Sequence, residues 1–178
     1  TARWVQPLFL PGEASISPAE IEAVLRGSVE AHKIADVEVA GFLSGGVDSG
    51  LITALARPAR SYTIRYAEPR YDESLPARAL ARSLGLRNHL RCISPGEFWD
   101  AVPAVQYHMD EPLADAAAVA LYFLNREAAR DVKVVLSGEG ADELFGGYNI
   151  YRDPFTMQWY DRLPPWLRGA LGTAASLV

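Results

Sequence analysis

Residues 37–49 read VEVAGFLSGGVDS, an apolar run that ends in a pair of glycines. The run Val37–Leu43 is typical of a buried strand, and the hydroxyls and acid after it favour a loop that opens a helix. The start of a helix leaves several backbone N–H groups without intrahelical partners, and these groups attract an anion. Gly45 and Gly46 permit the close backbone approach that an anion nest requires. The stretch therefore predicts a strand, a phosphate-binding loop and a helix.

The side chains of this loop strengthen the phosphate interpretation. Ser44 and Ser49 add hydroxyl donors, and Asp48 places a carboxylate where a phosphate-bound Mg²⁺ would sit. A glycine hairpin turn is the alternative, but such turns rarely carry two serines and an acid before a helical pattern. The loop has neither the lysine of the mononucleotide P-loop nor the G-x-G-x-x-G spacing of dinucleotide turns. We therefore expect a phosphate loop of another kind.

Length and composition fit one globular domain, expected over residues 1–178. The chain is 49% hydrophobic and 22% charged, and its length can bury a substantial core. Its 17 basic and 22 acidic residues give a formal net charge of −5, which argues against general binding of nucleic acid or an anionic membrane. The sequence shows neither a transmembrane stretch nor a signal peptide. These features predict a cytoplasmic protein.

The single cysteine, Cys92, fits a reducing compartment because it has no internal disulfide partner. It lies in the strand-like run Leu90–Ile93. We therefore expect a buried structural thiol rather than a nucleophile.

The rest of the chain alternates strands with helices, which predicts parallel pairing in a covered sheet. We expect an α/β domain with a parallel sheet of four to five strands and helices on both faces. The first helix, 17–34, opens with a capping box and carries one apolar face, expected to be buried: Ile21, Val24, Leu25, Ser28, Val29 and His32. The other expected elements are helices at 47–57, 73–84, after 94–97 and 115–130, and strands at 61–66, 88–93 and 132–136.

A second glycine-rich loop follows the last expected strand, where residues 137–148 read SGEGADELFGGY. Ligands gather beyond the carboxyl ends of parallel strands, so the two loops meet if their strands are neighbours. Glu139, Asp142 and Glu143 would then face Asp48. That set of acids needs a cation beside a phosphate, and Mg²⁺ shared by Asp48 and Asp142 would supply it. Helix caps are the alternative interpretation, which we favour for Glu143.

The two loops resemble known families. The S-G-G-x-D-S form is similar to the pyrophosphate loop of N-type ATP pyrophosphatases, and residues 137–148 resemble the synthetase domain of glutamine-hydrolysing asparagine synthetases. Residues 35–44, 71–78 and 110–115 agree with the same family, so the resemblance is collinear over roughly 17–155. It implies an adenine nucleotide alpha hydrolase-like, Rossmann-like fold.

The resemblance also implies ATP-dependent amide synthesis. Members of the family adenylate the side-chain carboxylate of aspartate with release of pyrophosphate, and ammonia then displaces AMP to give asparagine. In this chain the implied catalytic residues are Asp48, Asp142 and Glu139, with Asp48 and Asp142 on Mg²⁺ and Glu139 positioning ammonia or accepting its proton. The residues implied to bind ATP are Leu43, Ser44, Gly45, Gly46, Asp48, Ser49, Thr63, Ile64, Ser137 and Gly138.

Three acids, Asp110, Glu111 and Asp115, are candidates for the amino-acid pocket, and they are equally good helix caps. Residues 116–117 are Ala-Ala where relatives often carry Ser-Ser, which weakens that assignment.

The chain departs from the pattern of the family in two further ways. Residue 1 is Thr, whereas relatives begin with the cysteine nucleophile of a glutaminase domain. Neither Lys33 nor Lys133 matches the family's catalytic lysine. We therefore expect a truncated piece whose full-length form includes a glutaminase domain, and a homodimer is compatible with the sequence.

Several alternatives remain. A related adenylating amidotransferase, or a β-lactam-type synthetase, would act on another carboxylate with the same loop. An ATP-binding module without turnover would fit the missing lysine. A tRNA-thiolating pyrophosphatase is less favoured, because the chain is acidic and has one cysteine.

Overall fold

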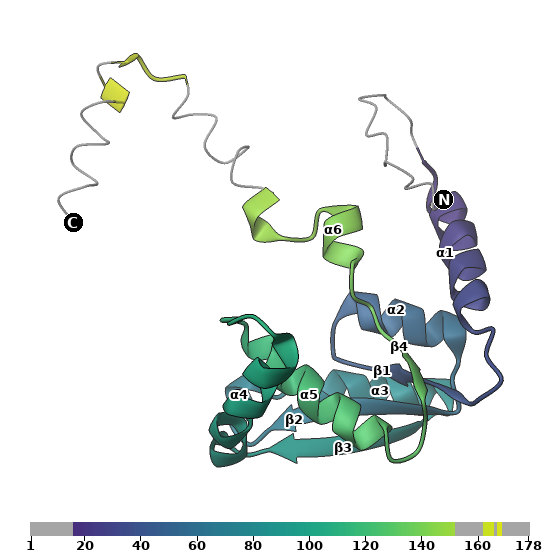
Figure 1. The fold of residues 1–178 in the computed structure, drawn as a ribbon. Coiled ribbons are helices and arrows are strands. Elements are labelled where there is room, and N and C mark those ends of the chain that lie inside the picture. The colour runs from purple at the N-terminus through teal and green to yellow at the C-terminus, as the bar shows by residue number, and fades with distance from the viewer. Residues whose placement is uncertain (1–15, 152–161, 166, 169–178) are drawn as a thin grey trace, which may run out of the picture.

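The computed structural model describes residues 16–151, 162–165 and 167–168. Within them, the strands β1 (Val39–Phe42), β2 (Arg60–Tyr66), β3 (Arg87–Ile93) and β4 (Val134–Leu136) form one parallel sheet in the order β3-β2-β1-β4 (Figure 1). The order reverses at β1, because β2 and β3 follow on one side of it and β4 on the other.

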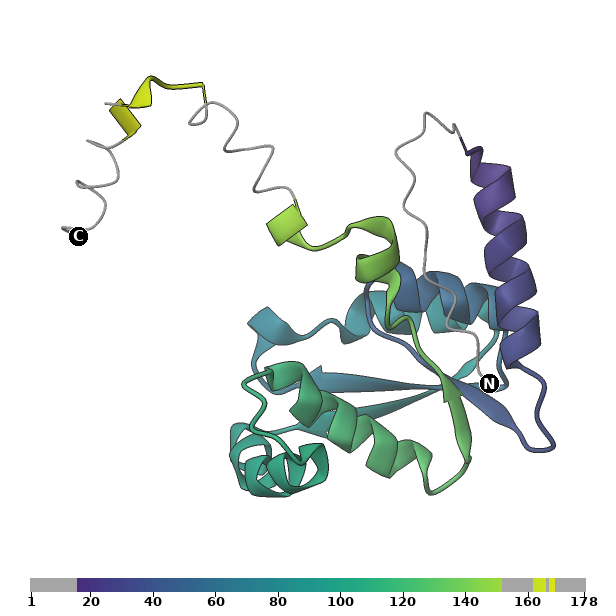
Figure 2. The ribbon, with the colours of Figure 1, turned by 45° about the horizontal axis from the view of Figure 1, so that its top comes forward.

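Helices cover both faces of this sheet, and Figure 2 separates the two layers. The helices are α1 (Pro18–His32), α2 (Val47–Ala56), α3 (Ser74–Leu84), α4 (Pro95–Met109), α5 (Ala116–Ala128) and α6 (Ala141–Phe145). Successive strand residues point to opposite faces, so Phe42 packs toward Ala128 at the end of α5, and Leu43 packs against Ala77 of α3. The predicted α/β domain with a parallel sheet and helices on both faces is confirmed.

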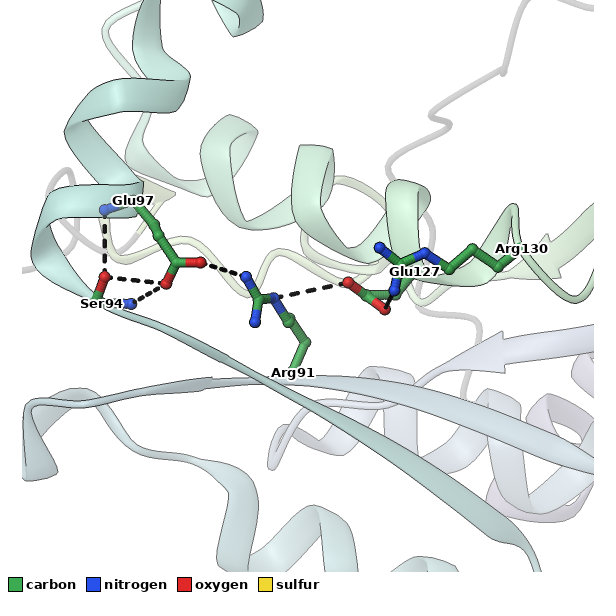
Figure 3. Close-up of polar contacts among 5 residues, drawn as sticks. All are labelled: Arg91, Ser94, Glu97, Glu127 and Arg130. Atoms are coloured by element: carbon green, nitrogen blue, oxygen red, sulfur yellow. Dashed lines mark hydrogen bonds and ion pairs between the residues drawn. The ribbon is translucent and has the colours of Figure 1, made fainter.

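A chain of charges fixes α4 and α5 over the edge strand β3 (Figure 3). Arg91 pairs with Glu97 in the first turn of α4, and its Nε lies 3.6 Å from Glu127 Oε1 on α5. Glu127 also pairs with Arg130 at 2.6 Å. Glu97 in addition completes a capping box with Ser94. Both helices are thereby held on the face that carries the largest apolar cluster, around Ile93, Val105 and Phe123.

The helix boundaries follow local signals in the sequence. Ser17 and Glu20 form the capping box expected at the start of α1. α3 ends at Gly85, whose φ of 72° is the left-handed conformation that glycine adopts without strain.

Two expectations about burial are wrong. Val29 is the only buried residue of the expected apolar face of α1, and Val24 is 72% exposed. α1 packs against α2, and Leu25, Ser28 and His32 of this face border a hollow between α1, α2 and α6. Cys92 is exposed rather than buried, because β3 is an edge strand and Cys92 points away from the face on which Ile93 packs under α4 and α5.

None of the helices in the part of the chain that the structure describes is long and apolar enough to cross a membrane.

Candidate functional site

The two glycine-rich loops touch at the carboxyl edge of the sheet. β1 and β4 are adjacent and parallel, with Gly41 opposite Leu136, so the loops that follow them start side by side. A Cβ on Gly138 would lie 2.7 Å from the backbone nitrogen of Ser49 and 2.9 Å from the carbonyl carbon of Asp48. Only glycine allows so close an approach of two backbones. The expectation that the loops share one edge is confirmed.

The first loop is closed by its own hydrogen bonds. The hydroxyls of Ser44 and Ser49 are 2.8 Å apart, and the Ser49 hydroxyl also accepts from the Ser44 N–H at 3.1 Å. The Gly46 N–H donates to the Ser44 hydroxyl at 3.1 Å. The serines therefore shape the loop, while the N–H groups of the first turn of α2, from Val47 onward, lie outside the helical ladder. These N–H groups are the ones that the sequence predicts to bind an anion, and that role stays a prediction.

A segment after β2 supports this loop from outside. A Cβ on Gly45 would lie 2.6 Å from Pro76 Cγ and 3.1 Å from the carbonyl oxygen of Glu73. Asp72 orders the segment, because its carboxylate accepts from the Ser74 N–H at 2.9 Å and lies 3.2 Å from Arg65 Nε.

Both contacts stabilise the charged carboxylate of Asp72. The hydrogen bonds from Ser74, and then the guanidinium of Arg65, lower the pKa of Asp72 below its ordinary value. The carboxylate of Asp72 therefore stays charged, and keeps these contacts, to a lower pH than an ordinary aspartate would.

The second loop leads into α6 through glycines at restricted positions. Gly140 and Gly146, on either side of α6, have φ of 88° and 68°. A Cβ on Gly147 would lie 1.9 Å from Asp142 Oδ1, so the Asp142 carboxylate occupies that space. In the same loop, the N–H of Glu139 donates a hydrogen bond to the Ser137 hydroxyl at 3.3 Å.

Glu143 accepts a hydrogen bond from the hydroxyl of Tyr148 at 2.9 Å. This bond, with burial and the nearby carboxylates, raises the pKa of Tyr148 to about 12. Glu143 thus ties the Gly-Gly-Tyr turn to α6, and it does not cap the helix, whose N-terminus has no side-chain cap.

Between the two loops lies a cleft of about 530 Å³, walled on the far side by α5. Thr63, whose role in ATP binding stays a prediction, does not line it: Thr63 is 1% exposed, and its hydroxyl donates to the carbonyl of Leu43 at 2.6 Å. Gly45 lies behind the loop against Pro76. The other predicted site residues line the cleft: Leu43, Ser44, Gly46, Asp48, Ser49, Ile64, Ser137, Gly138, Glu139 and Asp142.

The cleft also has lining residues that the sequence did not indicate. Most of them come from β2, from the segment between β2 and α3, and from α5 rather than from the loops: Tyr66, Arg70, Glu73, Ala117, Ala120, Leu121 and Leu124. Tyr148, the last residue of the second loop motif, lines the cleft as well.

The three acids that are candidates for an amino-acid pocket lie in different surroundings. The carboxylate of Asp115 accepts from the Ala117 N–H at 2.9 Å and caps α5. Asp115 also lines a second cavity of about 550 Å³ between α4 and α5, which reaches Glu139. Asp110 ends α4 with a φ of 61°, and Glu111 is exposed. Helix capping thus accounts for Asp115, although its place beside Glu139 keeps it a candidate.

The carboxylates of the cleft suit a hard cation. Asp48 and Asp142 come from different loops and line the same space, and carboxylate oxygens together with phosphate and water are the ligands that Mg²⁺ prefers. Within residues 16–151 and the short described stretches after them, no three His, Cys, Asp or Glu side chains cluster closely enough to hold a metal ion by themselves. The donor set therefore fits an ion that arrives with its own phosphate oxygens.

Comparison with solved structures identifies the fold. The chain superposes on the NMN synthetase from Francisella tularensis with a TM-score of 0.54 and 18% identity, over 75% of this chain and 59% of that one. The corresponding values for the NH3-dependent NAD synthetase from Campylobacter jejuni are 0.50, 17%, 76% and 62%. The fold is thus of the Rossmann-like, adenine nucleotide alpha hydrolase type.

Sequence comparisons identify the family. The chain is 48% identical over 157 residues to a putative glutamine-hydrolyzing asparagine synthetase of Mycobacterium tuberculosis, covering 86% of this chain and 24% of the relative. Glutamine-hydrolyzing asparagine synthetase 1 of Bacillus subtilis is 40% identical over 163 residues, covering 89% and 26%. The chain therefore spans about a quarter of the length of these relatives. Residues 20–177 match the family model described as asparagine synthase, and the chain belongs to that family.

Proposed function

We propose that this chain is the nucleotide-binding part of an asparagine synthetase, a ligase that forms AMP from ATP. The observation that carries the proposal is the contact between the two glycine loops, in which the backbone at Asp48 and Ser49 meets Gly138. One cleft therefore collects an anion seat from the first loop and carboxylates from the second. Family membership supports the same function.

The nucleotide would bind with its phosphates on the first loop. Backbone N–H groups at the start of α2 stabilise negative charge there, because they point toward the ligand together with the positive end of the helix. Leu43 and Ile64, at the ends of β1 and β2, line the cleft beside the loop and would flank the adenine and ribose. Thr63 would contribute indirectly, since its hydroxyl holds the carbonyl of Leu43.

The acids of the cleft would hold Mg²⁺ through Asp48 and Asp142. When bound, this ion would neutralise the charge of the phosphates next to these carboxylates. The contact between Gly138 and the first loop keeps the two acid-bearing loops together.

The proposed reaction has two steps at the carboxylate of aspartate. One carboxylate oxygen attacks the α-phosphorus of ATP, the bond to the bridging oxygen breaks, and pyrophosphate leaves. Ammonia nitrogen then attacks the acyl carbon and AMP leaves with the former carboxylate oxygen. Glu139 would accept the proton that the attacking nitrogen loses, because it lines the cleft between the two loops.

The source of ammonia would be a glutaminase domain. The relatives are named as glutamine-hydrolyzing enzymes, and this chain matches about a quarter of their length. We infer that the full-length protein joins the two activities. A homodimer stays a prediction.

A second candidate function is nucleotide binding without turnover by this chain. Of the side chains described as lining the cleft, none is a lysine. A site that completes catalysis with a lysine from outside these residues would bind ATP here and leave it intact.

Calorimetry tests the proposal through Asp48. We expect Mg²⁺-dependent ATP binding by the wild-type chain, strong weakening by Asp48→Asn, and pyrophosphate release when aspartate and ammonium are added. Asp100→Asn is the matched control, because Asp100 is exposed on α4 and does not line the cleft. Binding without release would favour the second candidate. A folded wild-type chain that binds no ATP would refute both.

A further inference from the structure

We propose that Arg70 binds the terminal phosphates of the nucleotide, opposite the anion seat of the first loop. This inference rests on the proposed function, since it concerns the same cleft. Arg70 lies in the short 3-10 helix η1 (Pro69–Tyr71), beyond the carboxyl end of β2, and its side chain lines the cleft.

The charges around the cleft distinguish Arg70 from the other lining residues, because most of the charged ones are acids. Five acids line this space: Asp48, Glu73, Glu139, Asp142 and Glu143. Among the lining residues that the structure describes, Arg70 is the one with a cationic side chain. A polyphosphate brings several negative charges toward these acids, and a metal ion offsets only part of them. A guanidinium at the same cleft offsets more, and its planar donors match two phosphate oxygens.

The position of Arg70 is fixed by the segment that supports the first loop. Three residues after Arg70, the carbonyl oxygen of Glu73 lies 3.1 Å from the position of a Cβ on Gly45. Between them, Asp72 holds the turn through Ser74 and Arg65. The backbone that carries Arg70 is therefore seated on the phosphate loop.

The side chain of Arg70 lies on the rim of the cleft. It is 80% exposed and pairs through Nε with Glu68 Oε1 at 3.3 Å. An exposed ion pair of this kind contributes little to stability. Leu43 and Ile64 line the same cleft and are far less exposed than Arg70, so we assign the base and sugar to their side of it. Phosphates that leave as pyrophosphate would reach solvent at this exposed position.

The experiment compares ligands that differ in their phosphates. Calorimetry with Mg²⁺ measures the affinities of ATP, inorganic pyrophosphate and AMP for the wild type and for Arg70→Gln. We expect Arg70→Gln to weaken ATP and pyrophosphate about tenfold, the cost of losing one charge-assisted contact. The affinity for AMP should change by less than about twofold, because AMP lacks the groups that Arg70 contacts.

Two further variants separate a specific contact from net charge. Arg82→Gln removes the same charge from an exposed position on α3, away from the cleft, and should leave all three affinities unchanged. Arg70→Lys should lose an intermediate amount, since it keeps the charge but not the paired donors.

Several results would overturn the inference. They are equal weakening of AMP and ATP by Arg70→Gln, an equal effect of Arg82→Gln, and unchanged ATP and pyrophosphate affinity in Arg70→Gln. A wild-type chain that binds no ATP would overturn the proposed function, and this inference with it.

Discussion

The two loops of the cleft are stabilised in different ways. The first loop is closed by hydrogen bonds between Ser44 and Ser49, and Glu73 and Pro76 at the start of α3 pack against it from outside. The second loop rests on the first through Gly138, and it leads into a helix whose Leu144 and Phe145 are 77% and 60% exposed. The shape of the first loop therefore depends mainly on its own hydrogen bonds and its packing, whereas the position of the second loop's acids, Glu139, Asp142 and Glu143, depends on contact with the first loop.

The comparison predicts that substitution of Gly138 causes the largest losses of stability and of ATP binding. Gly138→Ala would place a Cβ 2.7 Å from the Ser49 nitrogen, so the two loops must separate. We expect a loss of about 1–3 kcal/mol in unfolding free energy, typical of overpacking, and a loss of ATP binding that exceeds the loss of stability. Urea unfolding and calorimetry measure the two quantities.

A matched glycine controls for the added methyl group. Gly27 lies within α1 and has open space around it, so Gly27→Ala should stabilise the chain slightly and leave binding unchanged. If Gly138→Ala bound ATP like the wild type, the second loop would not depend on the first.

A smaller effect is expected at Gly45, which supports the first loop from outside. Gly45→Ala would bring a Cβ to 2.6 Å from Pro76 Cγ, which belongs to a ring that can only change its pucker, and to 3.1 Å from the carbonyl oxygen of Glu73. We expect a loss of about 1–2 kcal/mol. The double variant Gly45→Ala with Pro76→Ala should recover most of it in a double-mutant cycle. Additive losses would show that the contact with Pro76 is not the cause.

The hydrogen bonds within the first loop should matter less individually. Ser49→Ala removes the hydroxyl that accepts from the Ser44 N–H at 3.1 Å and contacts its hydroxyl at 2.8 Å. We expect a loss of about 1 kcal/mol in thermal or urea unfolding. ATP affinity should fall with it, since the hydroxyls shape the seat. Unchanged affinity would mean that the loop keeps its shape without them.

The smallest effect concerns the pH dependence of the second loop. The pKa of Tyr148 is raised to about 12 by its hydrogen bond to Glu143. A folded-state pKa above the unfolded value of about 10 means that the bond's contribution is complete below pH 10 and is lost as pH rises through 12.

An absorbance titration of phenolate formation, compared with Tyr148→Phe, isolates this group. Glu143→Gln should return the pKa of Tyr148 toward 10, its ordinary value. A pKa near 10 in the wild type would show that the Gly-Gly-Tyr turn is not tied to α6.

Much of this architecture could be predicted from the sequence because its signals are local. Apolar runs and capping residues predicted the strands and helices, and the glycines predicted both loops. Parallel pairing then required the loops to share an edge once β1 and β4 proved to be neighbours. The exposure of Cys92 could not be predicted from local patterns, because it depends on β3 lying at the edge of the sheet.

Some residues of the candidate site could likewise be predicted from local patterns, and others could not. Thr63 and Ile64 are adjacent in β2, so their side chains point to opposite faces, and only Ile64 lines the cleft. The two-residue period of a strand could have indicated this. Tyr66 lies two residues after Ile64 in β2 and lines the cleft from the same face, as the same period would indicate. Arg70 reaches the cleft only through the folded course of the chain after β2, and no local pattern marks it.

The central claim is that Asp48 and Asp142, on different loops, act on one Mg²⁺-nucleotide. A calorimetric double-mutant cycle with Asp48→Asn and Asp142→Asn tests it directly. We expect each single variant to weaken Mg²⁺-ATP binding, and the double variant to weaken it by less than the sum of the two free-energy losses, because both remove contacts to the same ion. Strictly additive losses, or an Asp142→Asn variant that binds as the wild type does, would contradict a shared site.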